Sequence, residues 1–331
     1  MKLTFVNVGY GEAILLEWEE SGHTFTALID GGSSEEREYQ ARSSERIPIW
    51  KYLKKIGIER LDLMVCTHIH EDHVGGLVKI AQLYPVKEFW QGFSPEFYKK
   101  MYWIDPLLAE APAQNRFIQA LNQYQALCET VAKQGGKICK VSEGTELFCG
   151  KNRSIKVVGP SENRLAAVKR DLVSLFEDKI LESFLQRVSC LDEGMNNQSL
   201  ILRVEWSGVS ILLPGDTNRE GYEDLSEDSV RANIFKLGHH GQKDSISDEL
   251  LEKISPEIAV CCASSDQKYH SADEKVMIQL EKSGVKIFFS DCPPVMGKQV
   301  PPHQALVFRI EEGEIKEKKY ISKEKAYESE I

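Results

Sequence analysis

The sequence predicts an α/β fold, a four-layer αββα sandwich in which two sheets pack together and helices cover their outer faces. Three observations lead to this prediction. Strand-like apolar runs recur in both halves of the chain, amphipathic stretches with helical spacing separate them, and 42% of the 331 residues are hydrophobic, enough for a sizeable core. No short repeat and no proline- and glycine-rich linker divides the chain. We therefore expect a single domain over residues 1–331, with a helical insertion at about 92–190.

The first ninety residues predict strands followed by helices. Short β-rich runs are separated by turn residues such as Gly9-Tyr10-Gly11 and by polar stretches. The predicted strands are at residues 3–8, 13–18, 24–29 and 61–66. Pro48 suits the first turn of a helix that Gly57 ends, and residues 74–83 have the periodicity of a second helix.

The rest of the chain predicts a helical middle and a second set of strands. Residues 91–134 and 164–187 have helical character, and we expect them to be insertions over one edge of the sandwich. The remaining predicted strands are at residues 137–141, 155–158, 199–206, 209–213, 233–237, 257–262, 285–289 and 305–310, with helices near 247–253 and 272–282.

Charge and cysteine content exclude several classes of protein. The chain has 41 lysines and arginines against 51 aspartates and glutamates, a net charge of −10, which disfavours non-specific binding of long duplex nucleic acid. The eight cysteines include no CxxC pattern and lie mostly in apolar runs, as free thiols do in a reducing compartment. No stretch has the character of a signal peptide or a membrane span, so we expect a cytoplasmic protein without a membrane partner.

The strongest functional signal is the motif HIHEDH, which carries His68, His70, Asp72 and His73. It directly follows a predicted strand, and an extended His-x-His points both imidazoles to one side because side chains alternate with period two. Asp72 and His73 then turn the other way and can hold a second ion. Imidazole and carboxylate ligands together suit zinc, iron or manganese. The alternative is a polar surface loop, which three of the chain's eight histidines within six residues disfavour.

Two further polar clusters follow apolar strands in the second half of the chain. Asp216 follows the apolar run 211–213, and a carboxylate there can bridge two metals, although a strand-end aspartate alone usually forms a turn. His239 and His240 lie between two glycines at the end of the next strand, in a loop that can approach a ligand closely. We expect the three clusters to converge around one or two ions at the edge of the sheets.

Together, these motifs resemble those of the metallo-β-lactamase superfamily, and more closely those of the hydrolase domain that ends the competence protein ComEC. That domain has VGxG, DGG, HxHxDHxGG, NNxSL, GD and GHHG in this order. The chain has VGYG at residues 8–11, DGG at 30–32, HIHEDHVGG at 68–76, NNQSL at 196–200, GD at 215–216 and GHHG at 238–241. The resemblance covers roughly residues 3–90 and 195–290, and it implies a stand-alone soluble relative with the metallo-β-lactamase fold.

The resemblance also implies a site for one or two ions, zinc or manganese. Position by position, the residues that match metal ligands are His68 and His70 for one ion, Asp72 and His73 for the other, Asp216 as the bridge, and either His239 or, preferably, His240 as the last ligand. Asp30 matches a carboxylate that orients the metal-binding loop.

Two departures from the family pattern concern this site. Many relatives have a further histidine where this chain has Asn196 and Asn197, so an amide oxygen or water would complete the His68/His70 position, which favours manganese or weaker zinc binding. We therefore expect the two ion positions to be unequal, with Asn197 in a supporting place. His270 lies where the group tends to carry a histidine that contacts a substrate oxygen or protonates the leaving group. Catalytic roles are assigned to Asp72 and His270, an exposed loop histidine being the alternative for the latter.

The leading interpretation is a metal-dependent hydrolase, a phosphodiesterase or nuclease-like enzyme that uses a hydroxide held between two metals. The alternatives are hydrolysis of a carbonyl compound, such as a lactone, thioester or β-lactam, and a non-catalytic metal-binding interaction module. No partner protein is indicated. If cations of the insertion cover the metal cleft, the expected substrate is a small phosphodiester or single-stranded nucleic acid. If these cations form a solvated helix face instead, they do not indicate the substrate. These cations are Lys99, Lys100, Arg116, Lys133, Lys137, Lys140, Arg164, Lys169 and Arg170.

Overall fold

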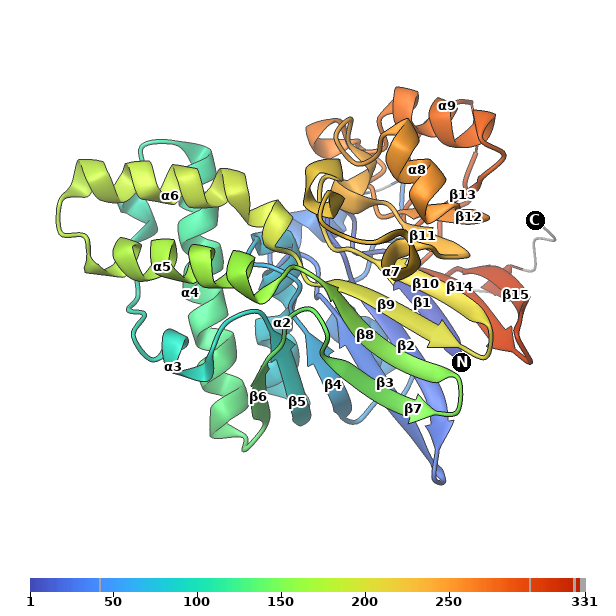
Figure 1. Ribbon diagram of the computed structural model, residues 1–331, viewed down its shortest axis with the longest axis horizontal. Coiled ribbons are helices and arrows are strands. Elements are labelled where there is room, and N and C mark those ends of the chain that lie inside the picture. The colour runs from blue at the N-terminus through green and yellow to red at the C-terminus, as the bar shows by residue number, and fades with distance from the viewer. Residues whose placement is uncertain (42, 298, 324–325, 328–331) are drawn as a thin grey trace.

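Two sheets form the centre of the computed structural model, which describes residues 1–41, 43–297, 299–323 and 326–327. One apolar core lies between the two sheets. A second core lies between the first sheet and the helices on its outer face, and a third lies between the second sheet and its helices (Figure 1). The predicted αββα fold class is therefore confirmed. No helix within the described residues is both long enough and apolar enough to cross a membrane.

The first sheet has nine strands within the described residues and contains both antiparallel and parallel pairs. In spatial order they are β16 (Ala326–Tyr327), β15 (Glu314–Ile321), β14 (Ala305–Glu311), β1 (Lys2–Val6), β2 (Ile14–Glu20), β3 (His23–Ile29), β4 (Leu61–Val65), β5 (Val86–Gln91) and β6 (Lys137–Lys140). From β3 to β6 all neighbours are parallel, so their carboxyl ends lie at one edge. Strand β4 is buried along its whole length, which explains its nearly continuous apolar sequence.

The second sheet has seven strands in the part of the chain that the structure describes. In spatial order they are β13 (Lys286–Phe289), β12 (Ile258–Cys261), β11 (Ile234–Lys236), β10 (Val209–Leu213), β9 (Ile201–Trp206), β8 (Arg153–Gly159) and β7 (Glu146–Gly150). The neighbours from β10 to β13 are parallel, and β7 to β10 are antiparallel. This sheet therefore also has a set of carboxyl ends at one edge.

Helices cover the outer face of each sheet. Helices α1 (Ile49–Lys55) and α2 (Glu71–Leu83) contribute to the core against the first sheet, and α7 (Glu227–Val230), α8 (Asp248–Ile254) and α9 (Glu274–Lys282) contribute to the core against the second. Short 3-10 helices lie at Glu36–Gln40, Pro106–Leu108, Asn196–Gln198, Arg219–Tyr222, Gly238–Gly241 and Lys268–His270.

The expected insertion consists of two helical parts at one end of the sandwich (Figure 1). The first contains α3 (Pro95–Tyr98) and α4 (Pro112–Lys133), and the second contains α5 (Glu162–Glu177) and α6 (Leu181–Met195). In sequence, the two parts are separated by strands β6, β7 and β8. Strand β6 belongs to the first sheet, and β7 and β8 belong to the second. Helix α4 is held against α6 by Gln114, whose Nε2 donates to Ser189 Oγ at 3.1 Å.

Several elements differ from the sequence prediction, which contained no strand at the position of β7. Strand β5 was not expected, because its residues alternate only weakly between buried and exposed positions. Helix α2 begins at Glu71 rather than at residue 74, since His70 has an extended backbone and the acidic side chains of Glu71 and Asp72 suit a first helical turn. As a result, Asp72 and His73 project from the first turn of α2, close to the carboxyl end of β4.

Candidate metal centre

Loops that follow parallel strands of both sheets meet at one edge of the sandwich. Asp30 follows β3, residues 66–70 connect β4 to α2, Asp216 follows β10, and His239 and His240 follow β11. The carboxyl ends of parallel strands are where α/β sheets generally place ligand sites. The three polar clusters of the sequence therefore lie side by side, although they come from opposite halves of the chain.

Asp72, His73, Asp216 and His240 form a tight group, which we call the inner cluster. His240 Nε2 lies 2.8 Å from Asp216 Oδ2 and 3.1 Å from Asp72 Oδ2. His73 Nε2 lies 3.2 Å from the same oxygen of Asp216. The ligand atoms of all four residues lie within 4.8 Å of one another, so that one ion can contact them together.

The second ring nitrogen of each inner histidine is held by the fold. His73 Nδ1 donates to Asp30 Oδ2 at 2.7 Å, and His240 Nδ1 donates to the Cys262 carbonyl at 2.8 Å. Both rings are fully buried and present Nε2 to the cluster, and His73 Nε2 has no hydrogen-bond partner among the described residues. Two imidazole nitrogens and two carboxylates, each oriented from behind, fit zinc or manganese.

The charges of the inner cluster attract a cation. Burial raises the pKa values of Asp72 and Asp216. The adjacent His73 and His240 lower these pKa values by more than burial raises them, so both carboxyl groups are ionised at neutral pH. Burial lowers the pKa of His240, whereas Asp216 and Asp72 raise it to about 9. The same carboxylates raise the pKa of His73 well above its ordinary value. Positive charge, as protons or as metal ions, is therefore required here.

His68 and His70, which we call the outer pair, lie beside the inner cluster. His68 Nε2 is 3.0 Å from His70 Nδ1, and the His68 ring centroid is 4.2 Å from that of His73. Thr67 Oγ1 accepts from His68 Nδ1 at 3.1 Å and itself donates to Asp30. Burial, together with His73 and His70, lowers the pKa of His68 well below its ordinary value, so its imidazole is neutral and able to bind a metal.

A buried lysine that the sequence analysis missed lies behind Asp216. Lys236 on β11 forms an ion pair with Glu12 and lies 3.3 Å from Asp216 Oδ1, and its Nζ donates to the Gly215 carbonyl at 2.8 Å. Burial lowers the pKa of Lys236, but Glu12 and Asp216 raise it above its ordinary value, so the ammonium group stays charged. Lys236 therefore interacts with Oδ1 of Asp216, and Oδ2 of Asp216 remains available to the inner cluster. Its only sequence signal is a lysine inside an otherwise apolar strand.

Not all predicted residues reach the inner cluster. His239 lies outside it and lines the neighbouring cavity, with Nδ1 3.0 Å from Asp244 Oδ1 and Nε2 3.1 Å from Asn196 Nδ2. Asn197 accepts a hydrogen bond from the backbone of Asn218 at 2.9 Å and so supports the loop after Asp216.

His270 is exposed and does not line the cavity next to the inner cluster. The backbone of Tyr269 and His270 adopts positive φ, which places Lys268 and Tyr269 along the cavity instead. His270 therefore lies outside the cavity wall, whereas Asp72 is part of it.

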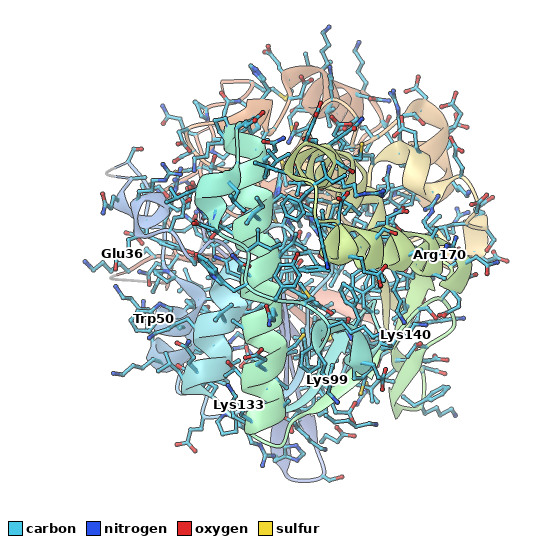
Figure 2. All side chains as sticks on the ribbon, turned by 90° about the vertical axis from the view of Figure 1, so that its left-hand side faces the viewer. Glu36, Trp50, Lys99, Lys133, Lys140 and Arg170 are labelled. Carbon is cyan, nitrogen blue, oxygen red and sulfur yellow. The ribbon has the colours of Figure 1, made fainter. Side chains whose placement is uncertain are left out.

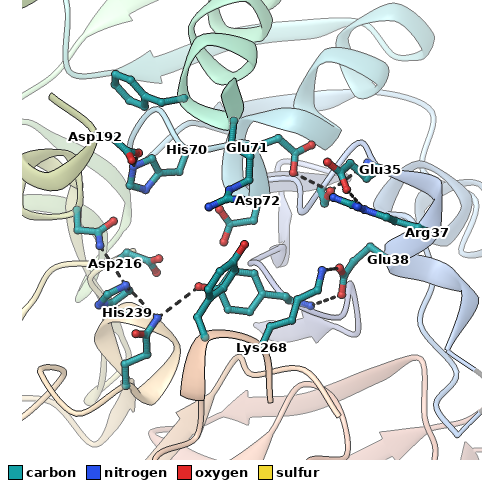
Figure 3. A pocket seen from close by; sticks show the side chains of 17 residues that line it. Glu35, Arg37, Glu38, His70, Glu71, Asp72, Asp192, Asp216, His239 and Lys268 are labelled. Atoms are coloured by element: carbon teal, nitrogen blue, oxygen red, sulfur yellow. Dashed lines mark hydrogen bonds and ion pairs between the residues drawn. The ribbon is translucent and has the colours of Figure 1, made fainter. Parts of the chain in front are cut away.

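The cavity beside the inner cluster has a volume of about 270 Å³. Its wall combines residues of both sheets with residues of the insertion (Figure 3). Asp72 and Asp216 line it from the metal centre, Tyr10 comes from the loop after β1, and Arg116 and Asp192 come from α4 and α6. Tyr10 lies in the VGYG motif but was given no role there, and Asp192 belongs to no recognisable spacing of ligands.

Only one of the nine insertion cations reaches this cavity. Arg116 lines it, with its guanidinium carbon 5.5 Å from the Tyr269 ring centroid. Lys99, Lys133, Lys140 and Arg170 are exposed on the outer side of the molecule that the insertion forms (Figure 2). The insertion therefore contributes one arginine to the wall of the cavity, and most of its other cations face solvent.

Comparison with known proteins relates this geometry to a family. Residues 6–97 match the metallo-beta-lactamase superfamily. Over these residues the chain is similar to that superfamily. The matched residues include Asp30, the outer pair, and Asp72 and His73, and the family resemblance expected from the motifs is confirmed.

The chain is also similar to competence proteins. It is 24% identical to ComE operon protein 3 of Bacillus subtilis (strain 168) over 276 residues, which are 80% of this chain and 29% of that protein. It is 31% identical to competence protein ComA of Neisseria gonorrhoeae over 99 residues, which are 29% of this chain and 14% of that protein. The chain thus spans less than a third of the length of these relatives.

Solved structures resemble the chain only distantly. Zn(2+)-bound PqqB from Methylobacterium extorquens is 10% identical, with a TM-score of 0.44, and the match covers 87% of this chain and 98% of that chain. The metallo-beta-lactamase from Cronobacter sakazakii with the HARLDQ motif is 12% identical, with a TM-score of 0.39, over 85% of this chain and 88% of that chain.

Proposed function

We propose that the protein is a metal-dependent hydrolase acting on a small phosphodiester or on the end of a single-stranded nucleic acid. The observation that supports this best is the inner cluster beside a cavity whose wall contains Arg116. Zinc or manganese held by the inner cluster and the outer pair would acidify a bound water and polarise the substrate. The substrate class is inferred from the cavity wall.

One cation of the cavity wall, Arg116, favours an anionic substrate. Arg37 and Lys268 also line the cavity, but they form ion pairs with Glu35 and Glu38. Arg116 lies over an aromatic ring instead and is paired with no carboxylate of the described residues. A guanidinium group binds phosphate oxygens through two parallel hydrogen bonds, whereas a lactone, thioester or β-lactam carbonyl offers no such charge.

The size of the cavity favours a small substrate. Pockets for small molecules usually measure roughly 300–1,000 Å³, so that 270 Å³ accommodates one phosphodiester group with its nearest substituents. The net charge of −10 disfavours a long polyanion along the surface.

The chain's own side chains hold the reacting groups in defined protonation states. Tyr10 lies 4.5 Å from His240, ring centroid to ring centroid, and burial and Asp72 raise its pKa well above the ordinary value. Its phenol therefore stays protonated, and the phenol oxygen accepts a hydrogen bond from Gln242 Nε2 at 3.4 Å. Asp72 stays ionised, so it acts as a metal ligand and hydrogen-bond acceptor and not as a general acid.

Metal analysis combined with a substrate screen tests the proposal. Protein purified without added ions should contain zinc or manganese, and it should hydrolyse bis-p-nitrophenyl phosphate in a metal-dependent manner. Turnover of a chromogenic β-lactam or thioester in place of the phosphodiester would contradict the substrate class. Protein that binds ions but hydrolyses none of these substrates would support the non-catalytic metal-binding module, and protein that binds no ion would contradict both interpretations.

A further inference from the structure

The two ring nitrogens of His70 face different neighbours. Nδ1 lies 3.0 Å from His68 Nε2, close to the ~3.3 Å that separates two ligands of a tetrahedral zinc ion with zinc–nitrogen bonds of about 2.0–2.1 Å. Nε2, on the far side of the ring, lies 3.2 Å from Asp192 Oδ1. His70 therefore directs Nδ1 toward the ion position and Nε2 toward helix α6 (Figure 3).

This orientation requires an acceptor at Nε2. An imidazole that binds a metal through Nδ1 must carry its proton on Nε2, and that N–H needs a partner when it is buried. Nε2 of His70 is buried and makes no hydrogen bond of good geometry to the described residues, so the nearby Asp192 carboxylate is placed to supply one after a small rotation.

The other three histidines of the centre are oriented in the same manner by groups of the two-sheet core. Thr67 serves His68, Asp30 serves His73, and the Cys262 carbonyl serves His240. Only His70 is oriented from the insertion. Phe117 of α4 contacts the same ring edge to face, with centroids 5.9 Å apart, so α4 and α6 of the insertion both lie against it.

We propose that Asp192 is a positioning residue that fixes the tautomer and orientation of His70, so that the helical insertion completes the outer metal position. The inference rests on the metal-binding part of the proposed function and not on its substrate. It gives the insertion a role that neither the matched segment 6–97 nor the ligand motifs assign. It also explains how the outer pair can hold an ion although Asn196 and Asn197 replace a further histidine.

The test compares Asp192→Ala and Asp192→Asn with Glu193→Gln, which removes a carboxylate from the neighbouring, exposed position of the same helix. Zinc affinities come from competition with a chromophoric chelator. Loss of an outer-shell partner typically weakens metal binding by about 10–100-fold. We expect that loss for one of the two ions in Asp192→Ala, a smaller loss in Asp192→Asn, whose amide oxygen still accepts, and wild-type binding in Glu193→Gln.

A spectroscopic measurement separates orientation from folding. In ¹⁵N-histidine-labelled protein, the His70 resonances should show the Nε2–H tautomer in the wild type and a mixture of tautomers in Asp192→Ala, at unchanged thermal stability. Equal weakening of both ions, or wild-type binding of both in Asp192→Ala, would overturn the inference. Loss of the outer ion in a protein without phosphodiesterase activity would instead leave the inference standing and contradict the proposed substrate. Absence of any bound ion in the wild type would overturn both.

Discussion

The inner cluster and the outer pair lie at the same edge of the sandwich but are supported by different parts of the chain. The inner cluster is held by groups that belong to the sheets, including Asp30 after β3 and Lys236 on β11. The outer pair depends on Thr67 for one ring and on the insertion for the other. The inner cluster is therefore oriented by the two sheets alone, whereas the outer pair also needs the helical insertion.

The largest effect is expected in the inner cluster. His240→Ala removes a fully buried ligand, so the inner ion should be lost and kcat/KM on bis-p-nitrophenyl phosphate should fall on the order of a thousandfold or more. Metal content by mass spectrometry and initial rates measure both. His270→Ala is the matched control and should retain both, because His270 is exposed outside the cavity. Equal losses in the two variants would remove the distinction.

The buried lysine gives the next largest effect. Lys236→Met leaves the carboxylates of Glu12 and Asp216 without their cation, so the free energy of unfolding in urea should fall by about 3–5 kcal/mol. The double variant Lys236→Met/Glu12→Gln should lose less, since one uncompensated charge is removed with the lysine. Lys282→Met, at an exposed position, is the control. A fall of the same size in the control would show that burial of the charge is not the cause.

The pH dependence of stability should differ between chelator-treated and zinc-loaded protein. In the metal-free state the pKa of His240 is about 9, above the ordinary 6.5, so its protonation stabilises the fold fully below pH 6.5. That contribution, about 3 kcal/mol, is lost as the pH rises through 9. Zinc should abolish this loss, because the ion takes the place of the proton. Urea unfolding from pH 6 to 9.5 measures it, and metal-free stability that rises over this range would contradict the charge assignment.

The smallest effect concerns the cavity wall. Arg116→Gln should raise KM for bis-p-nitrophenyl phosphate about tenfold, the loss of one charge-assisted hydrogen bond, with metal content unchanged. Arg170→Gln, an exposed cation of the insertion, should leave KM unchanged. If the two variants behave alike, the insertion acts as a diffuse charged surface and Arg116 does not contact the substrate.

Local patterns predicted much of this architecture. The strand runs and the motifs at their ends placed Asp30, residues 68–73 and Asp216 at one edge, because ligands adjacent in sequence and strand periodicity are both visible in a single chain. The choice of His240 over His239 came from the family resemblance, and the structure turns His240 toward the inner cluster.

Contacts between distant segments could not be predicted in this way. Lys236 and Asp192 have no motif of their own, and each acquires its role only when folding brings it to Asp216 or to His70. Strand β5 was missed for a similar reason, since its pairing with β4 and β6 decides its conformation more than its own sequence does.

The inner cluster also connects the two halves of the molecule. Asp72 and His73 come from the side of the first sheet, and Asp216 and His240 come from the second, so that the contact between Asp72 and His240 spans 168 positions of sequence. An ion bound by all four would act as a crosslink that closes this long loop, and its binding energy would add to the cohesion of the folded state. Chelation would then lower the stability of the folded state, although the apolar core between the sheets would remain. The ion would thus stabilise the folded protein as well as take part in the reaction.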